Sequence, residues 1–330
     1  MRIVVFGAQR RVGLLDGDSV VDVNNAVAAH FATTMGQAAA TAKAEFLAPP
    51  DLARFIAAGD DALELARTAA RHVKGSSDGS VVLPASLAKL HAPWAGRRMF
   101  CAAANYGQHV ADGQTNYGRP MTREQVEKEF RSRDPEGFTK LPAEFMGPED
   151  AIAYPGRTTQ MDYEGELAVV IGAQGRDIPL DRAKDHIWGL TLANDFSDRD
   201  GTQETKFPAS FNLMKTFDDC ASLGPCILID GSDPQDFDIT LEVNGEVRQN
   251  YNTNEMIHSF AEYISYLSKD LTLMPGDVIL GGTGTGTAAD QSKRTADGTP
   301  VNLDLFLSVG DVVEVKSAKI GLLRNRIVTR

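Results

Sequence analysis

The strongest structural signal in this sequence is one stretch that runs from acidic to apolar, Asp162-Tyr163-Glu164-Gly165-Glu166-Leu167-Ala168-Val169-Val170-Ile171-Gly172. Its second half is almost entirely apolar, which is typical of a strand buried on both faces. Because side chains alternate faces along a strand, we expect Asp162, Glu164 and Glu166 to point the same way. Two or three carboxylates should therefore converge where this strand enters a hydrophobic core.

Carboxylates packed this closely need a neutralising partner. Like charges repel and burial disfavours the charged form, so without a cation at least one carboxylate should take up a proton. Hard oxygen ligands suit Mg²⁺ or Mn²⁺, which are held by a few protein carboxylates and water. The alternative is a solvated strand end with surface acids, and this segment alone does not separate the two interpretations.

A second strand also ends in acidic residues. Residues 187–193 are apolar enough to form a buried strand, and they are followed by Asn194-Asp195. A carboxylate at the end of a core strand is well placed to be a third metal ligand, although Asn-Asp is also a common turn that Asp195 could cap. From the two acidic segments we expect Glu164, Glu166 and Asp195 to meet without a neutralising basic neighbour.

The composition argues against a nucleic-acid-binding, membrane-spanning or exported protein. The 330 residues are 42% hydrophobic and carry a formal charge of -12, so a large core is possible and a broad basic surface for nucleic acid is not expected. No apolar stretch approaches the roughly 20 residues that span a membrane. The N-terminus lacks an export signal, and Cys101, Cys220 and Cys226 have no metal or disulfide spacing. These features predict a cytoplasmic protein with reduced thiols.

The chain divides into a small N-terminal α+β domain, residues 1–93, and a strand-rich domain, residues 94–330. The first contains a predicted hairpin turn at Asp16-Gly17 and an alanine-rich helical region that Pro49-Pro50 interrupts. In the second, one helix is predicted near residues 256–267, with Asn252 and Glu255 as its capping box. The predicted fold class is α+β and mostly β, with β-type runs at residues 167–171, 187–192, 226–229, 239–243, 278–280 and 312–315.

An ordered set of motifs resembles the catalytic domain of the fumarylacetoacetate hydrolase family. Beside the two acidic segments, the matches cover essentially all of residues 100–327 and lie at residues 105–109, 197–200, 215–218, 223–225, 243–245, 273–280 and 321–325. Each match is weak alone, but their order makes the set strong. The resemblance implies a mixed β-sandwich roll for the catalytic domain and a homodimer.

The resemblance also assigns roles to residues. It implies that Glu164, Glu166 and Asp195 hold Mg²⁺ or Mn²⁺, and that Lys215 is the active-site lysine, stabilising a substrate enolate. A lysine that snorkels from an apolar segment is the alternative for Lys215. The residues that the resemblance implies position a small anionic 2-oxo acid are Tyr106, Arg199, Gln203 and Thr283.

His109 is the predicted base. Asp112 follows at i+3, where a helical turn puts both side chains on one face, and a carboxylate behind an imidazole raises its basicity. Hydrolytic members of the family usually carry Glu there, so Glu124 or Glu127 could replace Asp112. Both glutamates lie in residues 113–137, a charged segment that predicts either a lid helix or a solvated surface helix.

The glycine-rich residues 281–286 superficially resemble a nucleotide-binding loop. No apolar-periodic helix follows them, so a dinucleotide fold is not predicted. The family has a Thr-Gly-Thr-Pro-type turn here; this chain keeps Thr283 and has Gly284 in place of the proline, which we expect to loosen the turn.

The predicted function is hydrolysis of a carbon–carbon bond in a 2,4-dioxo acid such as an acylpyruvate. The substrate would chelate the cation, His109 with Asp112 would activate water, and Lys215 would stabilise the departing enolate. Three alternatives remain open at this point. They are an oxaloacetate-type decarboxylase, a 2-hydroxyhepta-2,4-diene-1,7-dioate isomerase, and a non-catalytic protein that binds metal and oxo acid.

Overall fold

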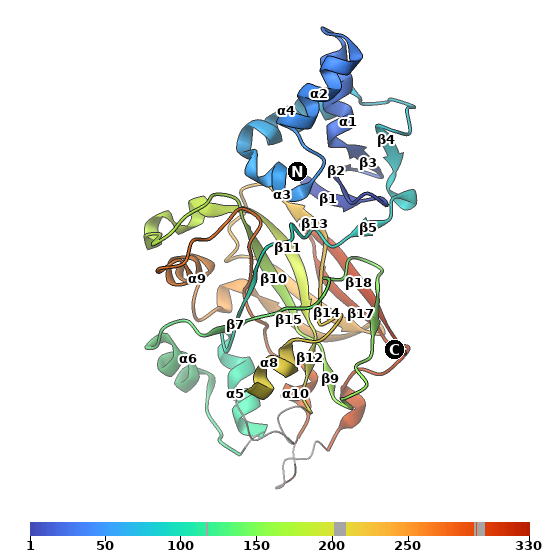
Figure 1. Ribbon diagram of the computed structural model, residues 1–330. Helices are drawn as coiled ribbons and strands as arrows, with labels where there is room; N and C mark the ends of the chain where they lie inside the picture. The colour runs from blue at the N-terminus through green and yellow to red at the C-terminus, as the bar shows by residue number, and fades with distance from the viewer. Residues whose placement is uncertain (117, 201–208, 294, 296–300) are drawn as a thin grey trace.

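The computed structural model describes residues 1–116, 118–200, 209–293, 295 and 301–330, and it places a small N-terminal module on one end of a larger β-sandwich (Figure 1). The predicted fold class, mixed α and β with mostly sheet, is confirmed. Within the described ranges, no helix is long and apolar enough to cross a membrane.

The N-terminal module contains the hairpin that the sequence predicts. Strands β2 and β3 pair with Asp16 opposite Ser19, and Gly17 takes the positive φ that this turn requires. Helices end and restart around the predicted break at Pro49-Pro50. The elements of the module are β1 (Arg2–Phe6), β2 (Arg11–Asp16), β3 (Ser19–Asp22), α1 (Val23–Ala32), α2 (Gln37–Leu47), α3 (Leu52–Ala57), α4 (Gly59–His72), β4 (Val82–Pro84), η1 (Ala85–Leu87) and β5 (Leu90–His91).

The module shares one sheet with the rest of the protein. Among the described residues, eleven strands form this sheet in the order β4-β3-β2-β1-β13-β11-β10-β16-β6-β7, with β5 paired to β1. The predicted boundary near residue 93 stays a prediction, since β1 hydrogen-bonds directly to β13 across it. The strands from the larger part are β6 (Met99–Ala102), β7 (Gly137–Thr139), β10 (Gly165–Ile171), β11 (Ile187–Asp195), β13 (Ala221–Leu228) and β16 (Val278–Leu280).

A second sheet packs against the large one and completes the sandwich. The described residues give it five strands in the order β15-β14-β17-β18-β8, and β9 pairs with β12 beside it. All six predicted β-type runs fall on strands. The bounds are β8 (Ala151–Ala153), β9 (Met161–Asp162), β12 (Ser197–Asp198), β14 (Asp238–Val243), β15 (Glu246–Asn252), β17 (Val312–Ser317) and β18 (Gly321–Val328).

Strand β10 is buried on both faces, which explains its continuous apolar run. Leu167 and Val169 join the core between the two sheets, whereas Ala168 and Val170 join a second core that extends to the helices of the N-terminal module. Glu166 is two residues before Ala168 and therefore points to the same face of the strand. Its carboxylate lies on the face away from the second sheet.

The helices of the larger part gather mainly around one end of the sandwich. The predicted helix near residues 256–267 begins later than expected. The capping box of Asn252 and Glu255 starts a 3-10 turn, and a second box of Ser259 and Glu262 starts α9. The helices are α5 (Gly107–Asn116), α6 (Arg123–Arg131), η2 (Leu180–His186), α8 (Ala209–Lys215), η3 (Thr253–Glu255), α9 (Phe260–Leu267), α10 (Ala288–Gln291) and η4 (Leu303–Leu305).

Candidate metal centre and proton-transfer site

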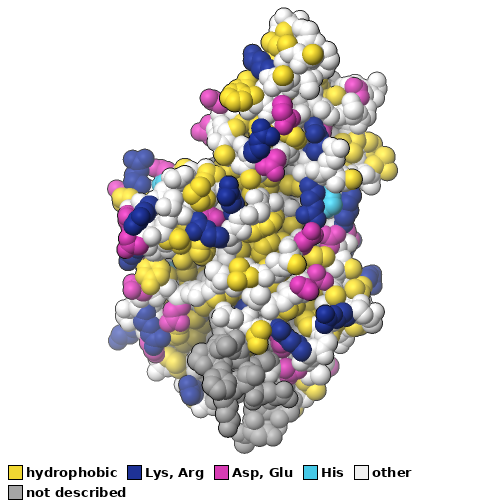
Figure 2. All heavy atoms as spheres, viewed as in Figure 1, with side chains coloured by type: hydrophobic (Ala, Val, Ile, Leu, Met, Phe, Trp, Pro, Cys, Tyr) yellow, Lys and Arg dark blue, Asp and Glu magenta, His cyan; other side chains and the backbone are white. Residues whose placement is uncertain are grey.

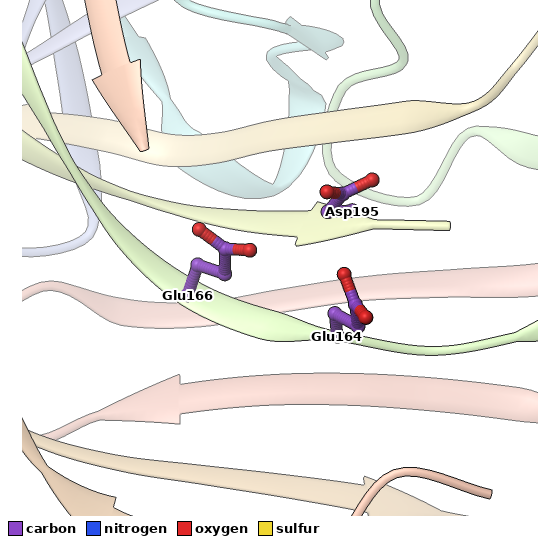
Figure 3. Close-up of side chains that lie close together, drawn as sticks. All are labelled: Glu164, Glu166 and Asp195. Carbon is purple, nitrogen blue, oxygen red and sulfur yellow. The ribbon is translucent and has the colours of Figure 1, made fainter. Parts of the chain in front are cut away.

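Three carboxylates meet at the end of the sandwich that carries α5, α8 and α10. Glu164 immediately precedes β10, Glu166 is its second residue, and Asp195 ends β11. The two strands are antiparallel neighbours, and Asp195 N donates to Glu164 O over 2.8 Å. One oxygen from each carboxylate lies within 4.8 Å of the others. Figure 3 shows the three side chains on the same side of the strands. The predicted convergence of these residues is therefore present, and all three are buried.

Two basic residues reach this carboxylate triad. Lys215 Nζ lies 2.5 Å from Glu164 Oε2 and 3.0 Å from Asp195 Oδ2, and it also donates to Ser197 Oγ over 2.6 Å. Arg199 forms a second ion pair with Glu164. The expectation of no basic neighbour was wrong, because the fold brings cations to the triad from parts of the chain outside β10 and β11. The lysine is buried among carboxylates and does not snorkel to solvent.

A third cation, Lys140, was not predicted as a site residue. Its side chain is 0% exposed, and its ammonium donates to the carbonyls of Phe196 (2.8 Å) and Cys220 (2.6 Å) while pairing with Asp195. Such a lysine serves as a fixed counter-ion for one end of the triad. The sequence signal for it was slight, a single lysine in an otherwise weakly polar segment.

Glu166 is the carboxylate of the triad whose negative charge has the fewest stabilising contacts. Among the described residues no basic side chain pairs with it, and its Oε2 accepts one hydrogen bond, from Gly282 N over 2.8 Å. Burial, followed by the charges of Asp195 and Glu164, raises its pKa well above the usual range. Burial acts on Glu164 in the same direction, but Lys215 and Arg199 outweigh it and hold the pKa of Glu164 low.

These features fit a divalent cation. The site offers buried, hard oxygen ligands, and one of them, Glu166, has no basic side-chain partner among the described residues. Glu164, Glu166 and Asp195 are the residues that would hold the ion.

We expect Mg²⁺ or Mn²⁺ to stabilise the folded protein. A ligand that binds only the native state at one hundred times its dissociation constant adds about 2.7 kcal/mol to the free energy of unfolding. Thermal melts with and without each ion, together with titration calorimetry, measure this effect. Absence of both binding heat and a melting shift in the wild type would contradict the metal assignment.

His109 has a carboxylate partner, but not the predicted one. His109 Nδ1 lies 2.8 Å from Asp290 Oδ2, whereas Asp112 accepts from Gln108 (2.8 Å) and from Thr285 (2.5 Å). The predicted pairing with Asp112 was wrong, because α10 brings Asp290 against α5 from a distant part of the chain. The Asp290 carboxylate is fixed by further hydrogen bonds from the N–H groups of residues 286 and 287.

Glu124 and Glu127, the predicted alternatives to Asp112, do not pair with His109 either. Glu127 pairs with Arg123 over 2.6 Å, and Glu124 is exposed on α6. Helix α6 is nevertheless not purely a surface element, because Val126 is fully buried against Val110 of α5. The segment therefore packs on the helix that carries His109.

The net environment of His109 favours its charged form. Burial lowers the pKa of His109, but the Asp290 carboxylate and the more distant Glu164 raise it further than burial lowers it. With Nδ1 directed at Asp290, Nε2 is the nitrogen left to exchange a proton with a bound molecule.

Comparison with known proteins agrees with this geometry. The family model for the fumarylacetoacetate (FAA) hydrolase C-terminal region matches residues 98–328. This chain belongs to the fumarylacetoacetate hydrolase family. Among relatives, the oxaloacetate tautomerase YisK of Bacillus subtilis is 33% identical over 286 residues, which are 84% of this chain and 87% of YisK. The mitochondrial oxaloacetate tautomerase fahd2 of Xenopus laevis is 32% identical over 285 residues, 85% of this chain and 79% of that protein.

Solved structures of the fumarylacetoacetate hydrolase family share the fold. A putative HpcE protein from Mycobacterium smegmatis has a TM-score of 0.75 at 29% identity, covering 100% of this chain and 99% of that one. The fumarylacetoacetate hydrolase of Exiguobacterium antarcticum has a TM-score of 0.71 at 26% identity and covers all of both chains. The 2-hydroxyhepta-2,4-diene-1,7-dioate isomerase of Mycobacterium marinum has a TM-score of 0.59 at 29% identity, covering 76% of this chain and 81% of that one.

The remaining residues suggested by resemblance to the fumarylacetoacetate hydrolase family lie beside β10, except one. Thr283 donates to the carbonyl of Gly165 (2.9 Å), and the hydroxyl of Tyr251 donates to the same carbonyl (2.6 Å). Tyr106 is buried and packs edge-on against Tyr251, with 5.0 Å between ring centroids. Gln203 lies outside the described residues. The substrate-positioning roles of these residues stay predictions.

Gly284 departs from the proline found at this turn in the fumarylacetoacetate hydrolase family, and the structure gives a reason. A Cβ atom at this position would lie 2.3 Å from Cγ of Tyr251, so the aromatic ring fills the space that a side chain would need. Far from leaving the turn loose, the glycine allows Tyr251 to pack against it.

Proposed function

We propose that this chain is a divalent-metal-dependent enzyme that interconverts the enol and keto forms of a small anionic 2-oxo acid, with oxaloacetate as the model substrate. One observation carries the proposal. Buried Lys215 and partly buried Arg199 form ion pairs with the carboxylate triad, and the Glu164 charge raises the pKa of His109, whose Nδ1 faces Asp290. Such a site can bind an anion, hold enolate charge and move one proton.

The relatives support this choice over the hydrolysis predicted from sequence. The family membership makes the chain an enzyme of this superfamily, and the relatives that it matches over most of its length are named oxaloacetate tautomerases. Tautomerisation and isomerisation require a proton donor and a cationic pocket. Hydrolysis requires, in addition, a positioned water molecule.

The acidic side chains of the site would bind the metal, and the basic side chains would bind the substrate. Glu164, Glu166 and Asp195 would hold Mg²⁺ or Mn²⁺, which supplies Lewis-acid stabilisation of negative charge when bound. Arg199, fixed by Asp162 and Glu164, offers a guanidinium to a substrate carboxylate. Lys215 places an ammonium where it can balance the charge of an enolate oxygen.

His109 moves the proton. In the direction from enol to keto, the imidazolium donates the proton from Nε2 to C3, while the electron pair of the carbon–carbon double bond forms the new C–H bond. The enol O–H proton leaves to solvent as the carbonyl forms, and Nε2 regains a proton from solvent before the next turnover. Asp290 accepts from Nδ1 throughout, so the ring keeps one orientation and one tautomer.

A substrate panel tests the proposed function. Apo protein and protein loaded with Mg²⁺ are assayed on the enol form of oxaloacetate, acetylpyruvate, fumarylpyruvate and a 2-hydroxydienedioate. We expect metal-dependent acceleration of the enol-to-keto conversion of oxaloacetate. Consumption of the acylpyruvates without any effect on that conversion would overturn the proposal.

Carbon–carbon bond hydrolysis is the second candidate function. The observation that favours it is the His109–Asp290 pair, because an imidazole with a carboxylate behind it is also what water activation requires. Release of acetate from acetylpyruvate distinguishes this candidate from tautomerisation.

We further propose that the protein is a cytoplasmic homodimer with no nucleic-acid or membrane partner. Strand β7 ends the large sheet and is followed by Leu141, which is 73% exposed, and Figure 2 shows hydrophobic side chains gathered on the middle of the visible face. An edge strand with exposed apolar neighbours is protected by pairing of subunits. Light scattering at micromolar concentration should give about twice the chain mass of 35.6 kDa. A single-chain mass would contradict the dimer.

A further inference from the structure

Asp162 is a buried carboxylate that stays outside the triad and connects two parts of the site. It ends β9, and its side chain is 0% exposed. Oδ1 accepts from the N–H groups of Tyr163 (2.9 Å) and Ala288 (2.8 Å), and Oδ2 accepts from Ala289 N (3.2 Å) and Arg199 Nε (3.0 Å). Asp162 therefore does not join the triad, as the alternation of the strand suggested it could.

The first connection runs to the imidazole. Ala288 and Ala289 form the first turn of α10, and Asp290, the next residue, accepts the hydrogen bond of His109. A helix of four residues has too few internal hydrogen bonds to hold its own position, so outside contacts decide where Asp290 lies. Asp162 supplies two of these contacts from the strand side.

The second connection runs to the triad. Arg199 donates from Nε to Asp162 and forms an ion pair with Glu164 through Nη2. A guanidinium bound at two nitrogens by two buried carboxylates has one allowed orientation. One side chain, Asp162, thus binds both α10 and the arginine that contacts the triad.

We propose that Asp162 is a positioning residue that fixes the His109–Asp290 pair relative to the carboxylate triad. This proposal depends on the proposed function in one respect, namely that His109 transfers the proton. A displacement of about 1 Å between reacting groups can reduce turnover by ~10²-fold, so a residue that sets this separation controls rate without touching substrate.

Asp162→Asn breaks the link with little change in volume. The amide oxygen can still accept from Tyr163 N and Ala288 N, but the NH₂ group then faces the N–H donors of Ala289 and Arg199, which leaves these two buried donors unsatisfied. The mismatch is relieved when α10 or Arg199 moves away. Asp277→Asn is the matched control, because Asp277 is equally buried and accepts from Arg98 and from Met274 N, and among the described residues its carboxylate has no hydrogen bond to the triad, His109 or α10.

The deciding readout is the His109 ring proton in proton NMR, assigned by its loss in His109→Gln. In Asp162→Asn we expect the hydrogen-bonded Nδ1 proton signal to move or disappear, and kcat to fall by about 10²-fold with a smaller change in KM. Asp277→Asn should lose thermal stability but keep the signal and the turnover. A folded Asp162→Asn protein with the wild-type signal and wild-type kcat would overturn the proposal.

A second variant covers the case in which Asp162→Asn does not fold. Ala288→Pro removes one of the N–H groups that Asp162 binds, at the first position of α10, where proline suits the backbone. It should shift the same His109 signal, and an unchanged signal would count against the proposal. Because the NMR readout needs no turnover, a shifted signal in a protein without tautomerase activity would reject the function and keep the inference.

Discussion

Replacing Glu166 with glutamine is expected to abolish turnover and, at the same time, to raise the melting temperature of the metal-free protein. Glu166 is buried beside two other carboxylates with one hydrogen bond from Gly282 and, among the described residues, no basic partner. Burial and the neighbouring charges raise its pKa, so the charged form is unfavourable in the folded state. Its contribution to stability is therefore present at low pH, where the acid is protonated, and is lost as pH rises through the raised pKa. Glutamine mimics the protonated acid.

Two measurements on Glu166→Gln separate metal binding from folding. Turnover should fall to the uncatalysed level, and the melting shift that Mg²⁺ causes in the wild type should vanish. Glu242→Gln is the control, since Glu242 lies on β14 and pairs with Lys316 at 2.6 Å outside the triad. A variant that keeps its turnover or its Mg²⁺-dependent melting shift would show that Glu166 is not a ligand.

His109→Ala is expected to slow the enol-to-keto conversion by about 10²-fold or more, the usual scale for loss of an acid–base group. Mg²⁺ binding should stay intact, because His109 lies outside the triad. Asp290→Asn should follow His109→Ala in direction, since its carboxylate orients the ring. Asp112→Ala should have a smaller effect, because Asp112 contacts Thr285 and Gln108 instead.

The His109→Ala experiment has a control variant, and one result would contradict the prediction. His72→Ala, at an exposed position of α4, should leave both conversion rate and metal binding unchanged. If His109→Ala stays within about twofold of wild type, His109 does not transfer the proton. The tautomerase would then have to use Lys215 or solvent as its proton donor.

Local patterns in the sequence predicted much of the fold. The hairpin at residues 16–17 and the apolar run of β10 depend on neighbouring residues, so turn chemistry and alternation identify them. The start of α9 was misplaced because two capping boxes, Asn252 with Glu255 and Ser259 with Glu262, follow each other closely in the sequence. Both satisfy the same local rule, and only tertiary packing selects which one begins the helix.

The sequence predicted the site residues that lie at the ends of adjacent strands. It did not predict the contacts that form when distant segments pack together. Glu164 and Glu166 lie where β10 begins and Asp195 lies where the adjacent strand β11 ends, so the sequence pattern of the two strands predicts them. The His109–Asp290 contact joins residues 181 positions apart, and no local pattern records it. Lys140 contacts Asp195 from a separate strand end, and its role follows only from the packed structure.

The most direct test of the proposed tautomerase is the decay of freshly dissolved enol oxaloacetate, followed by its ultraviolet absorbance. The enzyme is added with Mg²⁺, with a chelator, or as Glu166→Gln, and carbon dioxide release is recorded in parallel. We predict that wild-type enzyme with Mg²⁺ accelerates enol decay in proportion to enzyme concentration, without matching carbon dioxide release. Enol decay at the buffer rate in the presence of enzyme and metal would contradict the assignment.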